Sequence, residues 1–182
     1  MAQDQPLPRL WLLSDARNDA VLEDSLAALP RGSGFVFRHY HLTDEERLAR
    51  LRELRKQTRQ HGHLLVVAGN AGLARAVGSE GMYGPLPAII DGQDMLRLAT
   101  AHDAAEVDAA NEAEVDGIFL SPVFATRSHD RSDTLGPMGF SVLAQRSSVP
   151  IIALGGMTQD RADLIGWPRW GAIDGLSAPR DA

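Results

Sequence analysis

Residues 150–158 read PIIALGGMT, an apolar run between a proline and a pair of glycines. A short apolar run with such boundaries is typical of a strand that is buried on both faces of a parallel sheet. Thr158, just beyond the glycines, is a favourable N-cap residue for a following helix. The segment therefore predicts one strand-turn-helix unit of an α/β fold.

The same alternation recurs along the chain. Seven further runs read as strands, most of them followed by a helical pattern: 10–13, 34–42, 64–68, 81–83, 95–101, 117–120 and 171–173. Two helix starts carry a capping pattern, Thr43 with Glu46 and Asp103 with Glu106. With residues 150–154, these runs predict a (β/α)8 TIM barrel, and a doubly wound α/β sheet is the competing architecture.

The chain is short for a barrel. Its 182 residues leave about 23 for each of eight units, whereas the fold typically takes roughly 250 residues. The shortage falls at residues 84–94, which replace a full helix, and after Asp174, where little chain remains. We therefore expect a trimmed barrel with a short fourth connection and little or no eighth helix, forming a single domain over residues 1–182.

Composition excludes several classes of protein. Cysteine is absent, which rules out disulfides, thiolate nucleophiles and cysteine-ligated metal centres and is compatible with a reducing cytoplasm. A formal net charge of -6 argues against a general nucleic-acid surface. No apolar run approaches the roughly 20 residues that span a bilayer, and the first residues lack the order of a signal peptide. We expect a cytoplasmic protein that binds small molecules, with no nucleic-acid or membrane partner.

In such barrels the working residues follow the strands. Gly155 and Gly156 end one strand, and the backbone N–H groups of such a pair can bind an anion, although a tight turn alone also needs glycine. Another strand end, residues 117–120, leads into a polar loop with side chains that can wrap a phosphate: Thr126, Arg127, Ser128 and His129. The alternatives for this loop are an ordinary solvated loop or a mobile lid over residues 125–136.

Three segments together resemble a known family. Residues 121–128 (SPVFATRS), residues 135–136 (LG) and residues 150–156 (PIIALGG) are similar in order and spacing to the thiamine phosphate synthase/TenI family. The resemblance implies a (β/α)8 barrel. It also implies an enzyme of thiamine biosynthesis that joins a hydroxymethylpyrimidine pyrophosphate to a thiazole phosphate and releases pyrophosphate, with the help of Mg²⁺.

The resemblance also assigns binding residues. Thr126 and Ser128 match the family's hydroxyls at the thiazole phosphate, and Gly155 and Gly156 match its backbone anion site. His129 stands where the synthases carry a lysine. Two further positions are assigned elsewhere in the barrel: Thr100 to the pyrimidine substrate and Arg38 to the pyrophosphate.

The chain departs from the family pattern at several polar positions. Along the second strand, Val36, Arg38 and Tyr40 stand where three inward polar residues are usual. Gly69 replaces the usual aspartate ligand of Mg²⁺. Asp94, near a second family metal position, is a weak substitute ligand, and a polar turn is the alternative for it.

Two further acidic or titratable positions bear on the activity. Asp174 places an acid where a serine usually meets the thiazole phosphate, so Asp174 either points away or this end of the site is rebuilt. His102 matches a histidine of a metal-independent thiazole tautomerase in the same family and suits general acid-base work. A helix-capping role is the alternative for His102.

The residues leave three functions open. A thiamine phosphate synthase is the leading hypothesis; a TenI-like tautomerase using His102, without a cofactor, is the second; a non-catalytic thiazole-phosphate-binding protein is the third. A homodimer is possible. His39 and His41 would share one face of the predicted strand and could bind zinc. If Arg38 faces the barrel interior, however, both histidines face the helices.

Overall fold

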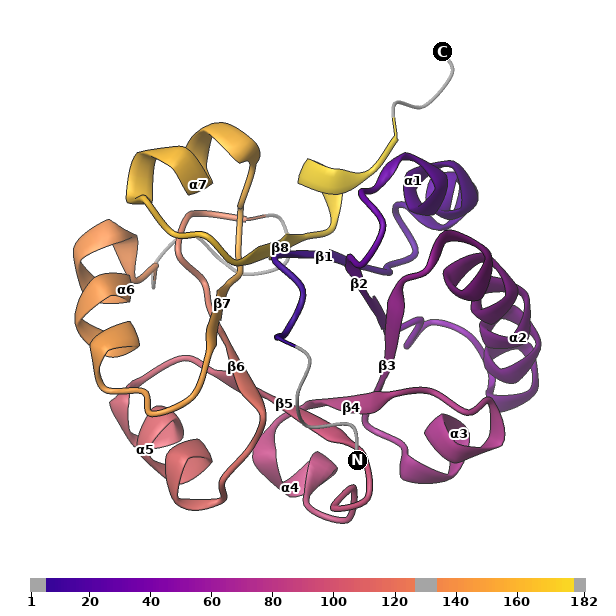
Figure 1. Cartoon of the computed structure of the whole chain (residues 1–182), viewed down its shortest axis with the longest axis horizontal. Helices are drawn as coiled ribbons and strands as arrows, with labels where there is room; N and C mark the ends of the chain where they lie inside the picture. Colours follow the sequence, from indigo (N-terminus) through magenta and orange to yellow (C-terminus); the bar gives the residue numbers. More distant parts are fainter. Residues whose placement is uncertain (1–5, 127–133, 179–182) are drawn as a thin grey trace.

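The computed structural model describes residues 6–126 and 134–178 of the chain. Eight parallel strands pair in chain order and the last closes onto the first, which confirms the predicted barrel (Figure 1). The strands are β1 Leu10–Leu13, β2 Gly34–Phe37, β3 Leu64–Ala68, β4 Gly81–Gly84, β5 Leu96–Ala101, β6 Gly117–Leu120, β7 Ile151–Ala153 and β8 Trp170–Ala172. The doubly wound alternative is wrong, because such a sheet is open and has two edges.

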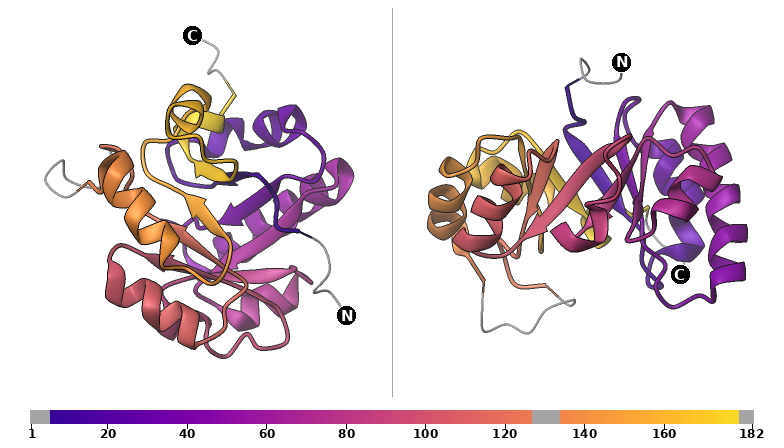
Figure 2. Two further views of the ribbon diagram at one scale, coloured as in Figure 1. Left: turned by 60° about the vertical axis from the view of Figure 1, so that its left-hand side comes forward. Right: turned by 90° about the horizontal axis from the view of Figure 1, so that it is seen from below.

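Helices surround the strands on the outside (Figures 1 and 2). They are α1 Leu22–Ala28, α2 Asp44–His61, α3 Ala71–Ala76, α4 Leu86–Ile89, α5 Ala104–Glu112, α6 Gly136–Gln145 and α7 Gln159–Ile165, with 3-10 turns η1 Asp19–Val21 and η2 Asp174–Leu176. The trimming is confirmed: α4 has 4 residues, and the 3-residue η2 stands where an eighth helix would follow. Within the two described ranges, no helix is long and apolar enough to cross a bilayer.

Apolar side chains form two cores, one on each side of the barrel wall. Outward side chains such as Phe37 and Ile118 pack against the helices. Inward side chains fill the barrel, where the edges of Trp11 and Tyr83 meet Phe119 with ring centroids 5.5 and 5.0 Å apart. Burial raises the pKa of Tyr83 to about 12, so its phenol stays protonated at neutral pH. The filled interior leaves a ligand only the ends of the barrel.

The segment before β1 closes the end of the barrel at which the strands begin. Leu7 belongs to the interior core, and Trp11 Nε1 donates a hydrogen bond of 2.9 Å to the carbonyl of Pro8. Figure 1 shows residues 6–9 running from β1 into the barrel opening. The loops that follow the strands, at the opposite end, are therefore the place for a site.

Both predicted pairs of a cap residue and a glutamate three positions later are present, and Thr158 caps α7 as predicted. The Thr43 side chain accepts from the backbone N–H of Glu46, and the Glu46 carboxylate accepts from the backbone N–H of Thr43, so α2 begins with a complete capping box. Asp103 caps α5 in the same manner by accepting from Glu106 N–H at 2.9 Å. These local patterns explain why the helices begin at the residues predicted.

The second strand differs from its prediction. β2 ends at Phe37 and not at residue 42, and His39 has a φ of 37°, in the left-handed region that non-glycine residues rarely adopt. This turn ends the strand's alternation of faces. Val36 does face the interior, as expected, but Tyr40 is 62% exposed, so its predicted place on an inward face is wrong. His39 faces the helices, as expected, and its ring stacks on Phe37.

Candidate anion-binding site

A pocket of about 580 Å³ lies at the carboxyl ends of the strands. Its wall includes residues that follow β1, β2, β6, β7 and β8, so segments far apart in the sequence meet there. The polar and glycine residues that matter most are Arg17, Arg38, Thr126, Gly155, Gly156 and Arg161. Four of the predicted site residues, Arg38, Thr126, Gly155 and Gly156, are therefore brought together.

The glycine pair permits a close approach between two loops. Gly155 and Gly156 have φ values of 95° and 61°. A Cβ atom on Gly155 would lie 2.6 Å from the Cα of Pro122, and one on Gly156 would lie 2.6 Å from the carbonyl oxygen of Ala125. Only glycine satisfies both the backbone conformation and the space. The loop after β7 can therefore pack directly against the loop after β6, which carries Thr126.

Three arginines place positive charge in the pocket wall. Arg38 was predicted from the family resemblance, whereas Arg17 and Arg161 were not anticipated. Arg161 stacks over Phe124, with its guanidinium carbon 4.9 Å from the ring centroid, and donates to the carbonyl of Gly156. The sequence signal for Arg17 and Arg161 was only their place shortly after a strand end, which solvated arginines share.

Carboxylates lie beside two of these arginines. Arg17 Nε is 3.1 Å from Asp15 Oδ1, and Arg38 Nη2 is 3.9 Å from Asp15 Oδ2. Arg17 Nη1 is also 3.7 Å from Asp174 Oδ2. Asp174 thus lines the pocket and does not point away, and the charge of Arg17 compensates for it. Of the two sequence alternatives for Asp174, this pairing favours a rebuilt end of the site, which stays a prediction.

Asn18 connects the first and last segments of the barrel at the pocket. Its side chain is almost fully buried and donates to the carbonyl of Leu13 and to Ser177 Oγ, each at 3.1 Å. Its amide oxygen accepts from the backbone N–H of Asp15 at 2.8 Å. Asn18 therefore holds the β1–α1 loop, including Asp15 and Arg17, against the turn that follows β8. This role of Asn18 could not be predicted, because Ser177, the partner that makes the connection, is 159 positions away in sequence.

Other predicted site residues lie elsewhere. Thr100 shares the interior face of β5 with Leu96 and Leu98 and is half-buried, and it is not part of the described pocket wall. His102 is also outside that wall; its ring Nδ1 is 2.9 Å from Glu106 Oε2. Ser128, His129 and most of the proposed lid lie outside the described residues.

Neither of the two positions that the resemblance relates to Mg²⁺ offers a good ligand for that ion. Gly69 has no side chain and a φ of 65°. Asp94 accepts hydrogen bonds from Arg75 at 2.7 and 3.3 Å, and this pair lowers the pKa of Asp94. Asp94 already neutralises the Arg75 guanidinium, and it lies on an exposed turn outside the pocket wall. It is therefore a poor ligand for a cation bound to the substrate.

One group of potential metal ligands does occur within the described ranges. Asp19, His39 and His41 each place a ligand atom within 4.8 Å of the others. Asp19 also accepts from Arg50 Nε at 2.8 Å, and both ring nitrogens of His39 have hydrogen-bond partners. Arg50 already neutralises the Asp19 carboxylate, and His39 has no lone pair left for a metal ion. We therefore interpret this group as a hydrogen-bond network and not as a metal site.

The fold and the pocket define a class of protein, the (β/α)8 barrels with a pocket at the carboxyl ends of the strands, lined here by three arginines. Within that class, the sequence model of the family described as thiamine monophosphate synthase matches residues 11–166. The chain belongs to this family.

Individual relatives agree with this assignment. A putative thiamine-phosphate synthase 2 from Aquifex aeolicus is 27% identical over 164 residues, covering 85% of this chain and 88% of the relative. The bifunctional protein ThiM/ThiE of Symbiobacterium thermophilum is 33% identical over 83% of this chain, which matches only 33% of that longer protein.

A solved structure gives the same fold. Thiamine phosphate pyrophosphorylase from Pyrococcus furiosus superposes with a TM-score of 0.78 over 92% of this chain and 86% of that one, at 20% sequence identity. At this level of identity the likeness concerns the barrel, and the chemistry must be argued from the residues of this chain.

Proposed function

We propose that this chain makes thiamine phosphate by joining a hydroxymethylpyrimidine pyrophosphate to a thiazole phosphate. The observation that carries the proposal is the meeting of Arg38, Thr126 and the Gly155–Gly156 pair in one pocket. These are residues that the family resemblance assigns to the two phosphorylated substrates. Their convergence supports binding both substrates at one end of the barrel.

The reaction needs positive charge where the pyrophosphate departs. Breaking the carbon–oxygen bond leaves the electron pair and negative charge on the pyrophosphate, and the thiazole nitrogen then forms the new bond to carbon. Arg38 and Arg17, on neighbouring loops, are suited to stabilise that charge. Thr126 and the backbone N–H groups near Gly156 would hold the thiazole phosphate and thereby orient its nitrogen.

No step is assigned to Mg²⁺, since Gly69 and Asp94 do not fit it. The predicted Mg²⁺ requirement stays a prediction that a chelator can test. The lack of good Mg²⁺ ligands at Gly69 and Asp94 favours a second candidate, the metal-independent tautomerase. In that reaction His102 would move a proton. The pairing of His102 with Glu106 would have to break for its ring to reach a ligand in the pocket. A binding protein without catalysis is the third candidate.

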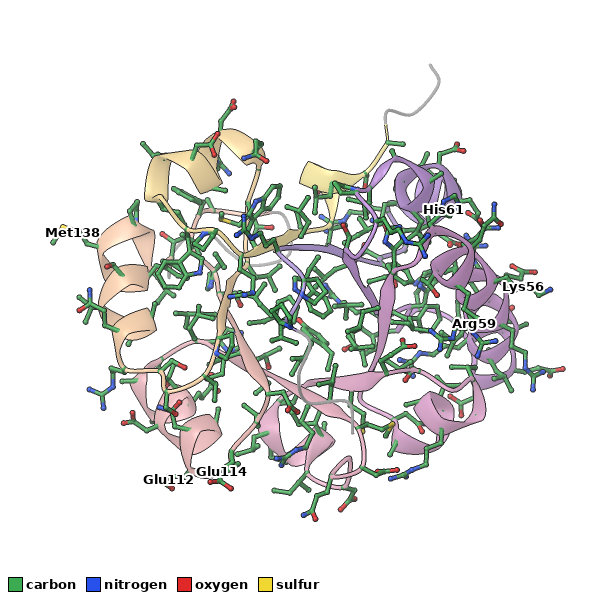
Figure 3. The ribbon with its side chains drawn as sticks, viewed as in Figure 1. Lys56, Arg59, His61, Glu112, Glu114 and Met138 are labelled. Atoms are coloured by element: carbon green, nitrogen blue, oxygen red, sulfur yellow. The ribbon has the colours of Figure 1, made fainter. Side chains whose placement is uncertain are left out.

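Formation of thiamine phosphate from the two substrates tests the proposal, with oxidation to fluorescent thiochrome as the readout. Parallel reactions contain Mg²⁺ or a chelator. Arg38→Ala should lose most of the activity, whereas Arg59→Ala, at an exposed position of α2 outside the pocket wall, should keep it (Figure 3). No product from the wild-type protein, with Mg²⁺ and both substrates present, would contradict the proposal.

If no product forms, an assay with a thiazole carboxylate phosphate distinguishes the other candidates. Turnover that resists chelator and disappears in His102→Ala would establish the tautomerase. Tight binding of thiazole phosphate without turnover of either substrate set would establish the binding protein. The homodimer stays a prediction, which sedimentation can test.

A further inference from the structure

A buried network of hydrogen bonds lies directly behind Arg38. The Ser14 hydroxyl oxygen accepts from the backbone N–H of Arg38 at 2.8 Å and lies 2.7 Å from His39 Nδ1. The other ring nitrogen, His39 Nε2, lies 2.9 Å from Asp19 Oδ1. Ser14 and the His39 side chain are fully inaccessible to solvent, so neither can touch a ligand in the pocket.

The protons of this network can be assigned from its partners. Because Ser14 Oγ accepts the Arg38 N–H, its own hydrogen is available to His39 Nδ1. His39 Nε2–H then donates to Asp19 Oδ1, the same oxygen that accepts from Arg50 Nε at 2.8 Å. This assignment requires a neutral imidazole, in agreement with the lowered pKa that burial imposes on His39.

Both backbone polar groups of Arg38 are held by side chains. Ser14 binds its N–H, and Arg47 Nε donates to its carbonyl oxygen at 3.1 Å. Arg47 is itself tied to the end of β3 through a 2.9 Å hydrogen bond to the carbonyl of Ala68. The backbone of Arg38 is thus fixed from β1 on one side and from α2 on the other.

His39 adds a strained conformation to this arrangement. Its φ of 37° is unfavourable for a residue with a Cβ atom, and its ring stacks on Phe37 at a centroid separation of 4.7 Å and an angle of 9°. The strain is tolerated because the ring is bonded at both nitrogens. Because of this turn at His39, the chain changes direction immediately after Arg38. Arg38 stays in the pocket wall, and Tyr40 is exposed to solvent.

We propose that His39 is a positioning residue that holds Arg38 in its anion-binding place through Ser14, without touching the ligand itself. The inference rests on the proposed role of Arg38 in binding a phosphorylated substrate. The inference gives the two imidazole nitrogens different roles. Nδ1 is linked to Arg38 through Ser14, whereas Nε2 contacts only Asp19.

Two substitutions test this separation, with the dissociation constant for inorganic pyrophosphate measured by calorimetry. His39→Asn can keep a polar atom near the Nδ1 position and tolerates a left-handed φ. His39→Gln instead reaches toward Asp19 and removes the acceptor of the Ser14 hydroxyl hydrogen, so that Ser14 keeps only its bond to the Arg38 N–H. We expect His39→Gln to weaken pyrophosphate binding about tenfold, as loss of a well-placed charged hydrogen bond would. His39→Asn should weaken binding much less.

A matched control separates positioning from general destabilisation. His63 is a second buried histidine, located before β3 at the opposite end of the barrel, where its Nε2 bonds to the carbonyl of Leu26. His63→Gln should lower the melting temperature comparably and leave pyrophosphate binding unchanged. If His39→Gln does not fold, Ser14→Ala removes the same link and should weaken binding in its place.

A double-mutant cycle decides whether the effect passes through Arg38. Arg38→Ala weakens binding by itself, and adding His39→Gln to it should then have no further effect. Additive losses, or wild-type affinity in His39→Gln and Ser14→Ala, would overturn the inference while leaving the proposed function intact. A wild-type protein that does not bind pyrophosphate would overturn both.

Discussion

Asp94 is paired with Arg75: Oδ1 of the carboxylate lies 2.7 Å from Nη2 of the guanidinium. Arg75 comes from the end of α3 and Asp94 from the turn before β5, so the pair joins two neighbouring connections of the barrel. Arg75 also donates to the carbonyl of Asp91. The acid that the sequence suggested as a metal ligand is therefore paired with Arg75 in the structure, and its binding of Mg²⁺ stays a prediction.

Asp94→Asn should leave the response to Mg²⁺ unchanged. The pair is exposed, and the carboxylate is not part of the described pocket wall. Thiamine phosphate formation measured across a Mg²⁺ titration should give the same half-saturating concentration as the wild-type protein. Arg75→Gln is the control for loss of the ion pair alone. A response lost in Asp94→Asn but kept in Arg75→Gln would restore Asp94 as a ligand.

Gly156→Ala should abolish binding of thiazole phosphate. The added Cβ atom would meet the carbonyl oxygen of Ala125 at 2.6 Å and separate the loops after β6 and β7. Gly166→Ala is the matched control. The φ of Gly166, 60°, is within a degree of that of Gly156, but a Cβ atom added there would have no atom within 4 Å. The left-handed φ should destabilise each alanine variant by about 1–2 kcal/mol of backbone strain. Equal binding by the two variants would show that the loop contact is unimportant.

Asp174→Asn should strengthen binding of inorganic phosphate. The change removes a negative charge from the pocket wall and releases Arg17 from one of its carboxylates. We expect a gain of about threefold at low ionic strength that shrinks as salt is added, since the pair is partly exposed. Glu112→Gln, on the far side of the barrel, makes the same change in net charge and should have no effect (Figure 3).

Stability should decline as the pH falls below about 6.5, the ordinary pKa of histidine. Burial lowers the pKa of His39 in the folded state, against the opposing effect of Asp19, while His41 and Arg50 lower it further. Burial likewise lowers the pKa of His63. The unfolded chain therefore binds protons that the folded chain excludes, and the stabilisation present above pH 6.5 is lost as the pH falls.

The free energy of unfolding, measured by denaturant titration between pH 5 and 7, checks this expectation. His39→Asn and His63→Asn should each reduce its slope with pH, and the double variant should reduce the slope most. The slope is the readout, because either substitution also lowers stability at neutral pH by leaving space in the core. A slope equal to that of the wild-type protein in the double variant would contradict the assignment.

The parts of the fold that could be predicted depend on local patterns. The Thr43–Glu46 capping box uses only residues within one turn, so its sequence pattern is sufficient. Residues 64–68 and 117–120 are apolar throughout because both faces of their strands are covered, and their predicted bounds match β3 and β6. The end of β2 could not be predicted, because His39 is held in its unusual conformation by Ser14 and Asp19, which are 25 and 20 positions away in sequence.

The residues of the candidate site also differ in whether the sequence could predict them. Gly155 and Gly156 could be recognised because a glycine pair after a buried strand is a local signal. Arg17 and Arg161 could not, because nothing local distinguishes an arginine in a pocket wall from one in water. Asp94 looked like a ligand in sequence for the same reason, since its partner Arg75 is known only from the packing of two connections.

The sequence by itself determined the barrel, its shortened connections and the glycine turn at one strand end. These follow from hydrophobic runs, chain length and backbone conformational limits, which act over a few residues. Only the tertiary structure decided which charges share the pocket, which acid is already paired, and how the backbone of Arg38 is held. Coulombic and hydrogen-bond partners are chosen by distance in space, and the closed barrel brings together residues from its first and last strands.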